Sequence, residues 1–173
     1  MDNMKIKIRL RAIKEKDIWL LHKWINDPEI IKYTNSYRPI DEIEQNEWFN
    51  SIYKNKQQHV FGIELIESER LIGTCGLYDI DFISHKAELR LKIGDKQEWG
   101  KGYGKAASKL LVDFGFRDIN LHRIWLKVFG DNKAAIKIYK DAGFIMEGEM
   151  KDDMFIQGQY KDVVIMGLIK CLN

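Results

Sequence analysis

A glycine-rich segment in the second half of the chain has the residue types and spacing that bind phosphate groups. Residues 97–105 have the sequence QEWGKGYGK, and a helical pattern begins inside this segment. Glycine permits positive φ angles and lets a ligand approach the backbone closely. Where such a turn opens a helix, successive N–H groups and the helix dipole together favour an anion such as a pyrophosphate. Lys101 and Lys105 add two positive charges near the turn.

Two common nucleotide-binding motifs differ from this segment. The Rossmann motif G-x-G-x-x-G follows a first strand and precedes an acidic residue by about 20 positions. Gly100, Gly102 and Gly104 are instead spaced two apart and lie late in the chain. The Walker motif G-x-x-x-x-G-K-[ST] is absent. On these residues alone, the alternatives are an anion site of another kind and a glycine-rich loop that binds no ligand.

The elements on either side of the turn have the sharpest patterns in the chain. Before the turn, apolar residues alternate with charged ones over residues 87–93, which is the period of a half-buried strand. This alternation places Glu88 on the face opposite the apolar residues. After the turn, apolar residues recur at helical spacing. They define one face of a helix: Tyr103, Ala106, Ala107, Leu110, Leu111 and Phe114.

The other segments predict a mixed sheet with helices on both sides. Alternating runs predict strands near residues 6–10, 60–66, 71–78, 124–128, 144–155 and 160–169. Helical spacing predicts helices near residues 18–25, 41–52 and 135–142, with Trp48, Phe49 and Ile52 as the buried stripe of the second. Hairpins and βα units occur together in this order. We therefore predict an α/β (α+β) fold with a mixed, mostly antiparallel sheet of about seven strands, four helices and a single domain over residues 1–173.

The composition and the cysteines disfavour several classes of protein. The net charge of +2 is too small to imply nucleic acid or an anionic membrane, and no basic stripe is interleaved with aromatic residues. No signal peptide begins the sequence, and no run approaches the ~20 apolar residues of a membrane helix. Cys75, Cys171 and the four histidines show no metal-ligand spacing. We predict a cytoplasmic protein with reduced cysteines, no metal, and no nucleic-acid or membrane partner.

Several segments in the correct order resemble the GNAT superfamily of N-acetyltransferases. QEWGKG at 97–102 is similar to the pyrophosphate-binding signature of that family, and AEL at 87–89 to its central strand. NKAAIKIYKDAGF at 132–144 resembles its second conserved block. The ending FIQGQYKD at 155–162 is similar to the branch that contains ribosomal-protein-alanine and spermidine N-acetyltransferases. The resemblance covers nearly the whole chain and is weaker before residue 60.

The resemblance implies the GNAT fold and a reaction. Members of the family move an acetyl group from acetyl-CoA to a primary amine by direct attack, so Cys75 is interpreted as a core residue rather than a nucleophile. The pantetheine would follow the strand at Leu91, whose N–H is the candidate oxyanion donor. The residues implied to bind the coenzyme are Leu91, Ile93, Gln97, Trp99, Gly100, Lys101, Gly102, Tyr103, Gly104, Lys105, Asn132 and Tyr139. A non-catalytic acyl-CoA-binding module of the same fold is the alternative.

The resemblance also assigns residues to proton transfer. Tyr139 matches the tyrosine that lies near the sulfur, and a phenol with a pKa of about 10 can return a proton to the leaving thiolate. The helical spacing of Tyr139 fits an apolar stripe as well. Glu88 is the candidate general base, because burial would raise its pKa, and its alternative is an ion pair with Arg90 or Lys92. Asn132 either contacts the coenzyme or caps a helix.

The acceptor amine is the least defined part of the prediction. Four acidic residues within 41–47 would attract a cationic amine. Acids near a helix N-terminus are also favoured by the helix dipole alone, and we prefer this simpler interpretation. Tyr33, Tyr37 and Glu88 are predicted to contact the acceptor, which is a polyamine, an amino sugar or the N-terminal amine of a protein. Analogy with the family also allows a homodimer through the C-terminal strands.

Overall fold

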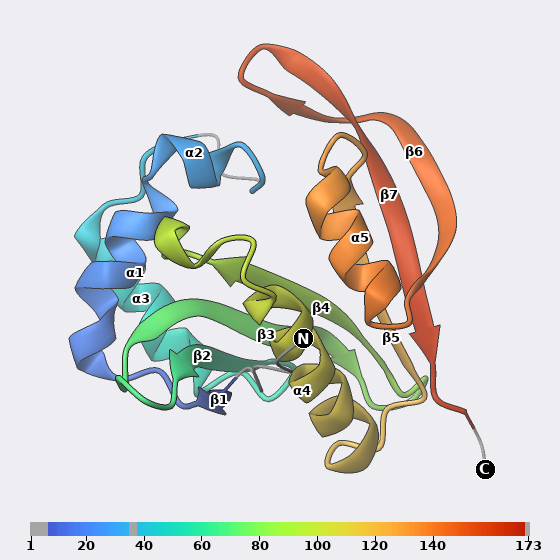
Figure 1. The fold of residues 1–173 in the computed structure, drawn as a ribbon, viewed down its shortest axis with the longest axis horizontal. Helices are drawn as coiled ribbons and strands as arrows, with labels where there is room; N and C mark the ends of the chain where they lie inside the picture. The colour runs from blue at the N-terminus through green and yellow to red at the C-terminus, as the bar shows by residue number, and fades with distance from the viewer. Residues whose placement is uncertain (1–6, 35–37, 172–173) are drawn as a thin grey trace, which may run out of the picture.

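The computed structural model describes residues 7–34 and 38–171, and its centre is a seven-stranded sheet (Figure 1). The strands lie in the order β1-β2-β3-β4-β5-β7-β6. Their bounds are β1 Ile8–Arg11, β2 His59–Leu65, β3 Leu71–Asp81, β4 Lys86–Ile93, β5 Arg123–Phe129, β6 Ile145–Ile156 and β7 Gln159–Ile169. All neighbouring pairs are antiparallel except β4 with β5. The predicted mixed, mostly antiparallel sheet is confirmed.

The parallel pair of strands at the centre of the sheet is short. Within the described chain, β4 pairs with β5 only over residues 86–88, which lie opposite residues 123–125. Beyond Glu88, β4 continues to Ile93 along β3, whereas β5 continues to Phe129 along β7. The sheet therefore parts along the second half of β4, and this edge of β4 keeps unpaired backbone groups.

The described residues form five α-helices, one more than predicted. Their bounds are α1 Ile18–Ile25, α2 Pro28–Ile31, α3 Glu42–Ile52, α4 Tyr103–Arg117 and α5 Lys133–Asp141. The additional helix is α2, which has four residues. The side chain of Asp27 accepts a hydrogen bond from the backbone N–H of Glu29, and proline suits the first helical position. The Asp27-Pro28 pair that ends α1 therefore also begins α2.

The helices cover both faces of the sheet (Figure 1). On β2, Val60 packs in a buried cluster with residues of α1, α2 and α3. The next residue, Phe61, packs against a second cluster that includes Leu111 of α4 and Tyr139 of α5. Because successive strand residues point to opposite faces, α1–α3 cover one face of the sheet and α4 with α5 cover the other.

Small residues set the orientation of α4 on the sheet. The buried residues of this helix include Gly104, Ala107, Leu111 and Gly115. A Cβ on Gly115 would lie 2.8 Å from Ile124, so the glycine permits a close approach of the helix to β5. The buried face is therefore rotated from the predicted one, and Leu110, predicted to be buried, is 39% exposed.

The apolar stripe of α3 is only partly buried. Ile52 is buried as predicted, together with the polar Gln45. Trp48 and Phe49 pack against the same cluster but remain partly exposed. The helix contacts α1, and its two buried residues lie two turns apart.

Candidate active site

The glycine turn presents backbone donors at the start of α4. Gly100 and Gly102 have φ angles of 75° and 84°, a region that strains any residue with a side chain. Gly102 is the N-cap of α4, and no side chain caps this end. The first N–H groups of a helix have no partner within it, so they remain available to a ligand at the positive end of the dipole. The backbone over residues 100–105 therefore has the geometry of an anion site.

The lysines of the turn are held by carboxylates of the protein. Lys101 Nζ lies 3.0 Å from Glu98 Oε2, and Lys105 Nζ lies 3.6 Å from Asp141 Oδ2. Glu98 is buried and also accepts a hydrogen bond from Arg70 at 2.5 Å. Hydrogen bonds from Lys101 and Arg70 hold the pKa of Glu98 below its usual range. The backbone N–H groups, rather than free ammonium groups, are therefore the main feature of this anion site.

The free edge of β4 carries the N–H groups of Leu91 and Ile93. Gly94 N donates to Ile72 O, in register with the β3–β4 ladder. Since donors alternate along an antiparallel ladder, the N–H groups of even-numbered residues point toward β3 and those of Leu91 and Ile93 point away. Trp99 Nε1 donates to Ile93 O at 2.8 Å, which ties the turn to this edge. The N–H of Leu91 thus faces the gap where β5 has parted from β4.

Three elements meet beside Leu91. A Cβ on Gly104 would lie 3.4 Å from Ile138 Cδ1 of α5 and 3.8 Å from Leu91 Cδ2 of β4. The next residue on α5, Tyr139, is buried, and its ring contacts Phe144 edge to face at 5.9 Å between centroids. Burial raises the pKa of the Tyr139 hydroxyl, and the nearby Cys75 raises it further by a smaller amount. Tyr139 therefore stays protonated on the α4–α5 side of β4, in the form that can donate a proton.

Asn132 caps one short helix, and Gln97 lies within another. The side chain of Asn132 accepts a hydrogen bond from Ala135 N at 3.1 Å and caps α5. Its amide NH₂ remains as a donor, so capping and coenzyme contact are compatible. Gln97 lies in the 3-10 helix η2 (Lys96–Glu98), where its N–H donates to Asp95 Oδ1 and its side chain is exposed.

Glu88 forms the ion pair that was its alternative interpretation. Its Oε2 accepts hydrogen bonds from Arg90 Nη2 at 2.5 Å and Nε at 3.0 Å. Arg90 also pairs with Asp79 at 3.2 Å and lies 4.6 Å from the ring centroid of Tyr78. Glu88 is buried on the face opposite α4, as the alternation predicted, and its Oε2 is engaged by Arg90.

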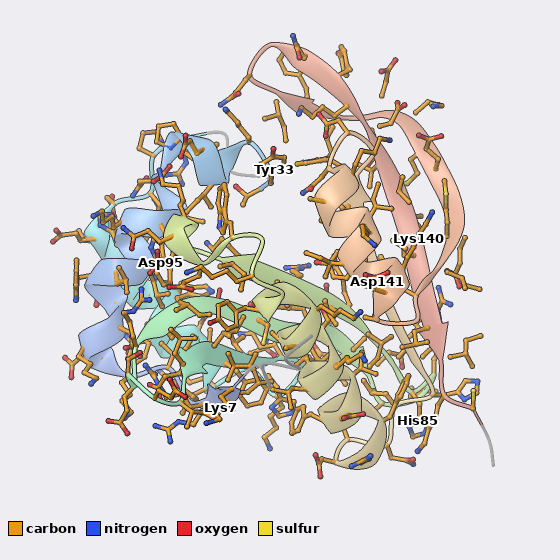
Figure 2. The ribbon with its side chains drawn as sticks, in the orientation of Figure 1. Lys7, Tyr33, His85, Asp95, Lys140 and Asp141 are labelled. Carbon is orange, nitrogen blue, oxygen red and sulfur yellow. The ribbon has the colours of Figure 1, made fainter. Side chains whose placement is uncertain are left out.

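A polar pocket lies between α2 and the β6–β7 hairpin. Its volume is about 300 Å³. The residues that line this acceptor-side pocket are Lys32, Tyr33, Asp131, Ile156, Gln157, Gln159 and Lys161. Figure 2 shows Tyr33 just after α2, on the side toward α5. Tyr37, the other tyrosine predicted to contact the acceptor, lies outside the described residues.

A larger cavity, of about 390 Å³, lies away from these residues, beside β2. It is lined by Ile52, Tyr53, Asn55, Lys56, Gln58, His59, Val60, Phe61 and Phe82. None of the described residues predicted for the site lines this cavity, and neither does any residue of β4 or β5. The acceptor-side pocket of about 300 Å³ is therefore the one that bears on the site.

The acidic residues of α3 serve the helix itself. Asp41 caps α3 by accepting a hydrogen bond from Glu44 N at 2.9 Å. The Glu44 carboxylate in turn pairs with Arg38, with an N–O distance of 2.6 Å. These contacts support the simpler interpretation of the acidic run, in which its charges stabilise the start of a helix.

Sequence reasoning missed two parts of the site. Gln157 and Gln159 were considered only as part of the ending that resembles one branch of the family, yet the hairpin brings them to the pocket that Tyr33 lines. Lys92 was considered only as a partner for Glu88. Burial lowers the pKa of its ammonium group to about 8. The alternation along β4 was the available signal, because it places Lys92 on the same face as Glu88.

The remaining observations concern cysteines, metals and membranes. Cys75 is buried and Cys171 exposed, and both are free thiols. Burial raises the pKa of the Cys75 thiol, which keeps it protonated and unsuited to nucleophilic attack. Among the described residues, no group of three or more His, Cys, Asp or Glu side chains is arranged to hold a metal ion. No helix in the described ranges is long and apolar enough to span a membrane.

Comparison with known proteins gives matches along almost the whole chain. A family described as "Acetyltransferase (GNAT) domain" matches residues 7–145. An uncharacterized N-acetyltransferase p20 of Bacillus licheniformis is 32% identical over 95% of this chain and 93% of its own length. A spermidine N(1)-acetyltransferase of Vibrio cholerae is 30% identical over 96% of this chain and 95% of its own length.

The fold also matches solved structures. The crystal structure of spermidine N-acetyltransferase from Vibrio cholerae in complex with CoA and spermine has a TM-score of 0.89 to this chain. The two sequences are 29% identical, and the match covers 94% of this chain and 95% of that one.

Proposed function

The chain belongs to the GNAT acetyltransferase family, and from that premise we propose that it acetylates a primary amine of a small polyamine with acetyl-CoA. The chain is an N-acetyltransferase; the polyamine is the proposed part. The relatives named spermidine N-acetyltransferases support this acceptor, because they match more than nine-tenths of the chain. One bound structure among them holds CoA and spermine.

The observation that carries the proposal is the parting of β4 from β5 beside the glycine turn. In the proposed mechanism the N–H groups of residues 100–105 bind the coenzyme diphosphate. The N–H of Leu91 donates to the acetyl oxygen as negative charge develops on it. Tyr139, which burial keeps protonated, returns a proton to the departing thiolate.

The acceptor would reach the acetyl group from the face of β4 opposite Tyr139. The acceptor-side pocket supports this direction, since Tyr33 and the hairpin residues line it. We also propose that residues 1–173 act as one domain, because one sheet takes strands from residue 8 to residue 169. A cytoplasmic location and a homodimer remain predictions.

A thiol-release assay over a panel of amines tests this function. The panel contains spermidine, spermine, an amino-sugar nucleotide and a peptide with a free N-terminus. We expect acetyl-CoA-dependent thiol release with the polyamines. Thiol release with only the amino-sugar nucleotide or only the peptide would show that the acceptor is not a polyamine. No thiol release with any amine would contradict the enzymatic function.

A further inference from the structure

A lysine beside the centre of the proposed site has no role in the mechanism above. Lys92 follows Leu91 directly, on the half of β4 that has parted from β5. The side chain of Leu91 packs on the α4 side of the sheet, so that of Lys92 points to the opposite face. An acetyl group held at the Leu91 N–H would therefore have Tyr139 on one side and Lys92 on the other.

The amino group of Lys92 is poorly solvated and lacks a counter-charge. No described residue forms a hydrogen bond or ion pair with its Nζ, and burial is the cause of its lowered pKa. Charged groups of β3 and β4, and those at the start of α2, which covers the same face of the sheet, are paired: Asp79 and Glu88 with Arg90, and Asp27 and Glu29 with Lys96. The Tyr78 phenol on the same face stays neutral, because burial raises its pKa to about 12. The side chain of Lys92 is half-buried. An unpaired and partly desolvated cation costs folding free energy, which is typical of a functional position.

We propose that Lys92 is the base that accepts the proton of the attacking amine, an inference that rests on the proposed N-acetyltransferase function. The neutral Nζ takes one proton from the acceptor nitrogen as the N–C bond forms. The C–S bond then breaks, and Tyr139 gives its proton to the thiolate. Lys92 afterwards releases a proton to solvent and Tyr139 regains one. Each turnover thus converts one amine and one acetyl thioester into one amide and one free thiol.

Two features favour Lys92 over Glu88 in this role. Two hydrogen bonds from Arg90 to Oε2 hold the Glu88 carboxylate in an ion pair, whereas no described residue pairs with Lys92 Nζ. A base is most efficient when its pKa lies near the working pH, and burial brings the pKa of Lys92 to about 8. A cationic acceptor would further disfavour the protonated lysine, because like charges repel in a poorly solvated site.

The test compares Lys92→Met and Lys92→Arg with the wild-type chain, using the amine that releases thiol fastest in the panel. Lys109→Met is the matched control, because Lys109 is exposed on α4. We expect both Lys92 variants to lose about 10²-fold in kcat, which is typical of a missing general base. Coenzyme affinity, measured by titration calorimetry, should not change in any variant.

The pH dependence separates a base from a merely structural lysine. Because the neutral form is active, wild-type kcat at saturating acceptor should rise with pH and level off above about 8. Lys92→Met should lose this inflection. Its Tm should be unchanged or higher, since the variant removes an unpaired buried charge.

Three results would overturn the assignment of Lys92. Full activity of Lys92→Arg would do so, because arginine keeps the charge but cannot accept a proton. An inflection near pH 8 that persists in Lys92→Met would do so as well. Acetylation of Lys92 by acetyl-CoA alone, found by peptide mass spectrometry, would make it an acceptor instead. A wild-type chain that releases no thiol with any amine would instead contradict the proposed function.

Discussion

The coenzyme side and the acceptor side of the site are built in different ways. The coenzyme side consists of the free edge of β4, the glycine turn and the start of α4, which follow one another in residues 86–105. The acceptor-side pocket joins residues that follow α2 to Asp131, which precedes α5, and to residues of the β6–β7 hairpin. A site made of backbone within one segment requires glycines at fixed spacing. A site whose side chains come from segments far apart in the sequence requires no fixed spacing of residues within any one segment.

The largest effect is expected at Tyr139, where the two sides meet. Tyr139→Phe removes only the hydroxyl, so the proton can no longer be returned to the thiolate. We expect kcat to fall about 10²-fold with coenzyme affinity unchanged, measured by steady-state kinetics and calorimetry. Tyr160→Phe is the control, because Tyr160 is exposed on the hairpin. Unchanged turnover in Tyr139→Phe would remove this residue from the mechanism.

A smaller effect, confined to the coenzyme, is expected at Gly102. In Gly102→Ala, the added Cβ makes the positive φ angle of the turn less favourable by about 1–2 kcal/mol. This conformational cost opposes formation of the turn that binds the coenzyme. Coenzyme affinity should therefore fall about tenfold whichever acceptor is used, as measured by calorimetry. Gly148→Ala is the matched control, since a Cβ at Gly148 meets open space. Equal affinities of the two variants would contradict a backbone-built coenzyme side.

The smallest effect, confined to the acceptor, is expected at Tyr33. Tyr33→Ala removes one wall of the acceptor-side pocket, and a loss of about 1 kcal/mol would raise the acceptor KM about fivefold. Coenzyme affinity should stay the same. Ile43→Ala, at an exposed position of α3, serves as the control. A change in coenzyme affinity without a change in acceptor KM would show that the two sides are not separate.

The local patterns in the sequence were sufficient for most of the fold and for the geometry of the turn. The alternation at 87–93 and the glycines before α4 are set within one segment, and the structure places them as predicted. The short helix α2 was missed because four residues are too few for a periodic pattern. Its start depends on a single cap from Asp27.

The partners of individual side chains were harder to predict. The position of Glu88 on its face followed from the alternation, but its pairing with Arg90 was one of several alternatives. The contribution of Gln157 to the pocket depends on the twist of a long hairpin. The lowered pKa of Lys92 depends on burial by residues that lie far away in the sequence. These features arise from tertiary packing, and the pattern of residues within a single segment does not predict them.

A crystal structure of the chain with bound CoA would test the central claim most directly. We predict that the diphosphate oxygens lie within hydrogen-bonding distance of the N–H groups of residues 100–105, with the sulfur between Leu91 and Tyr139. A coenzyme bound elsewhere, with side chains filling the glycine turn, would contradict the account.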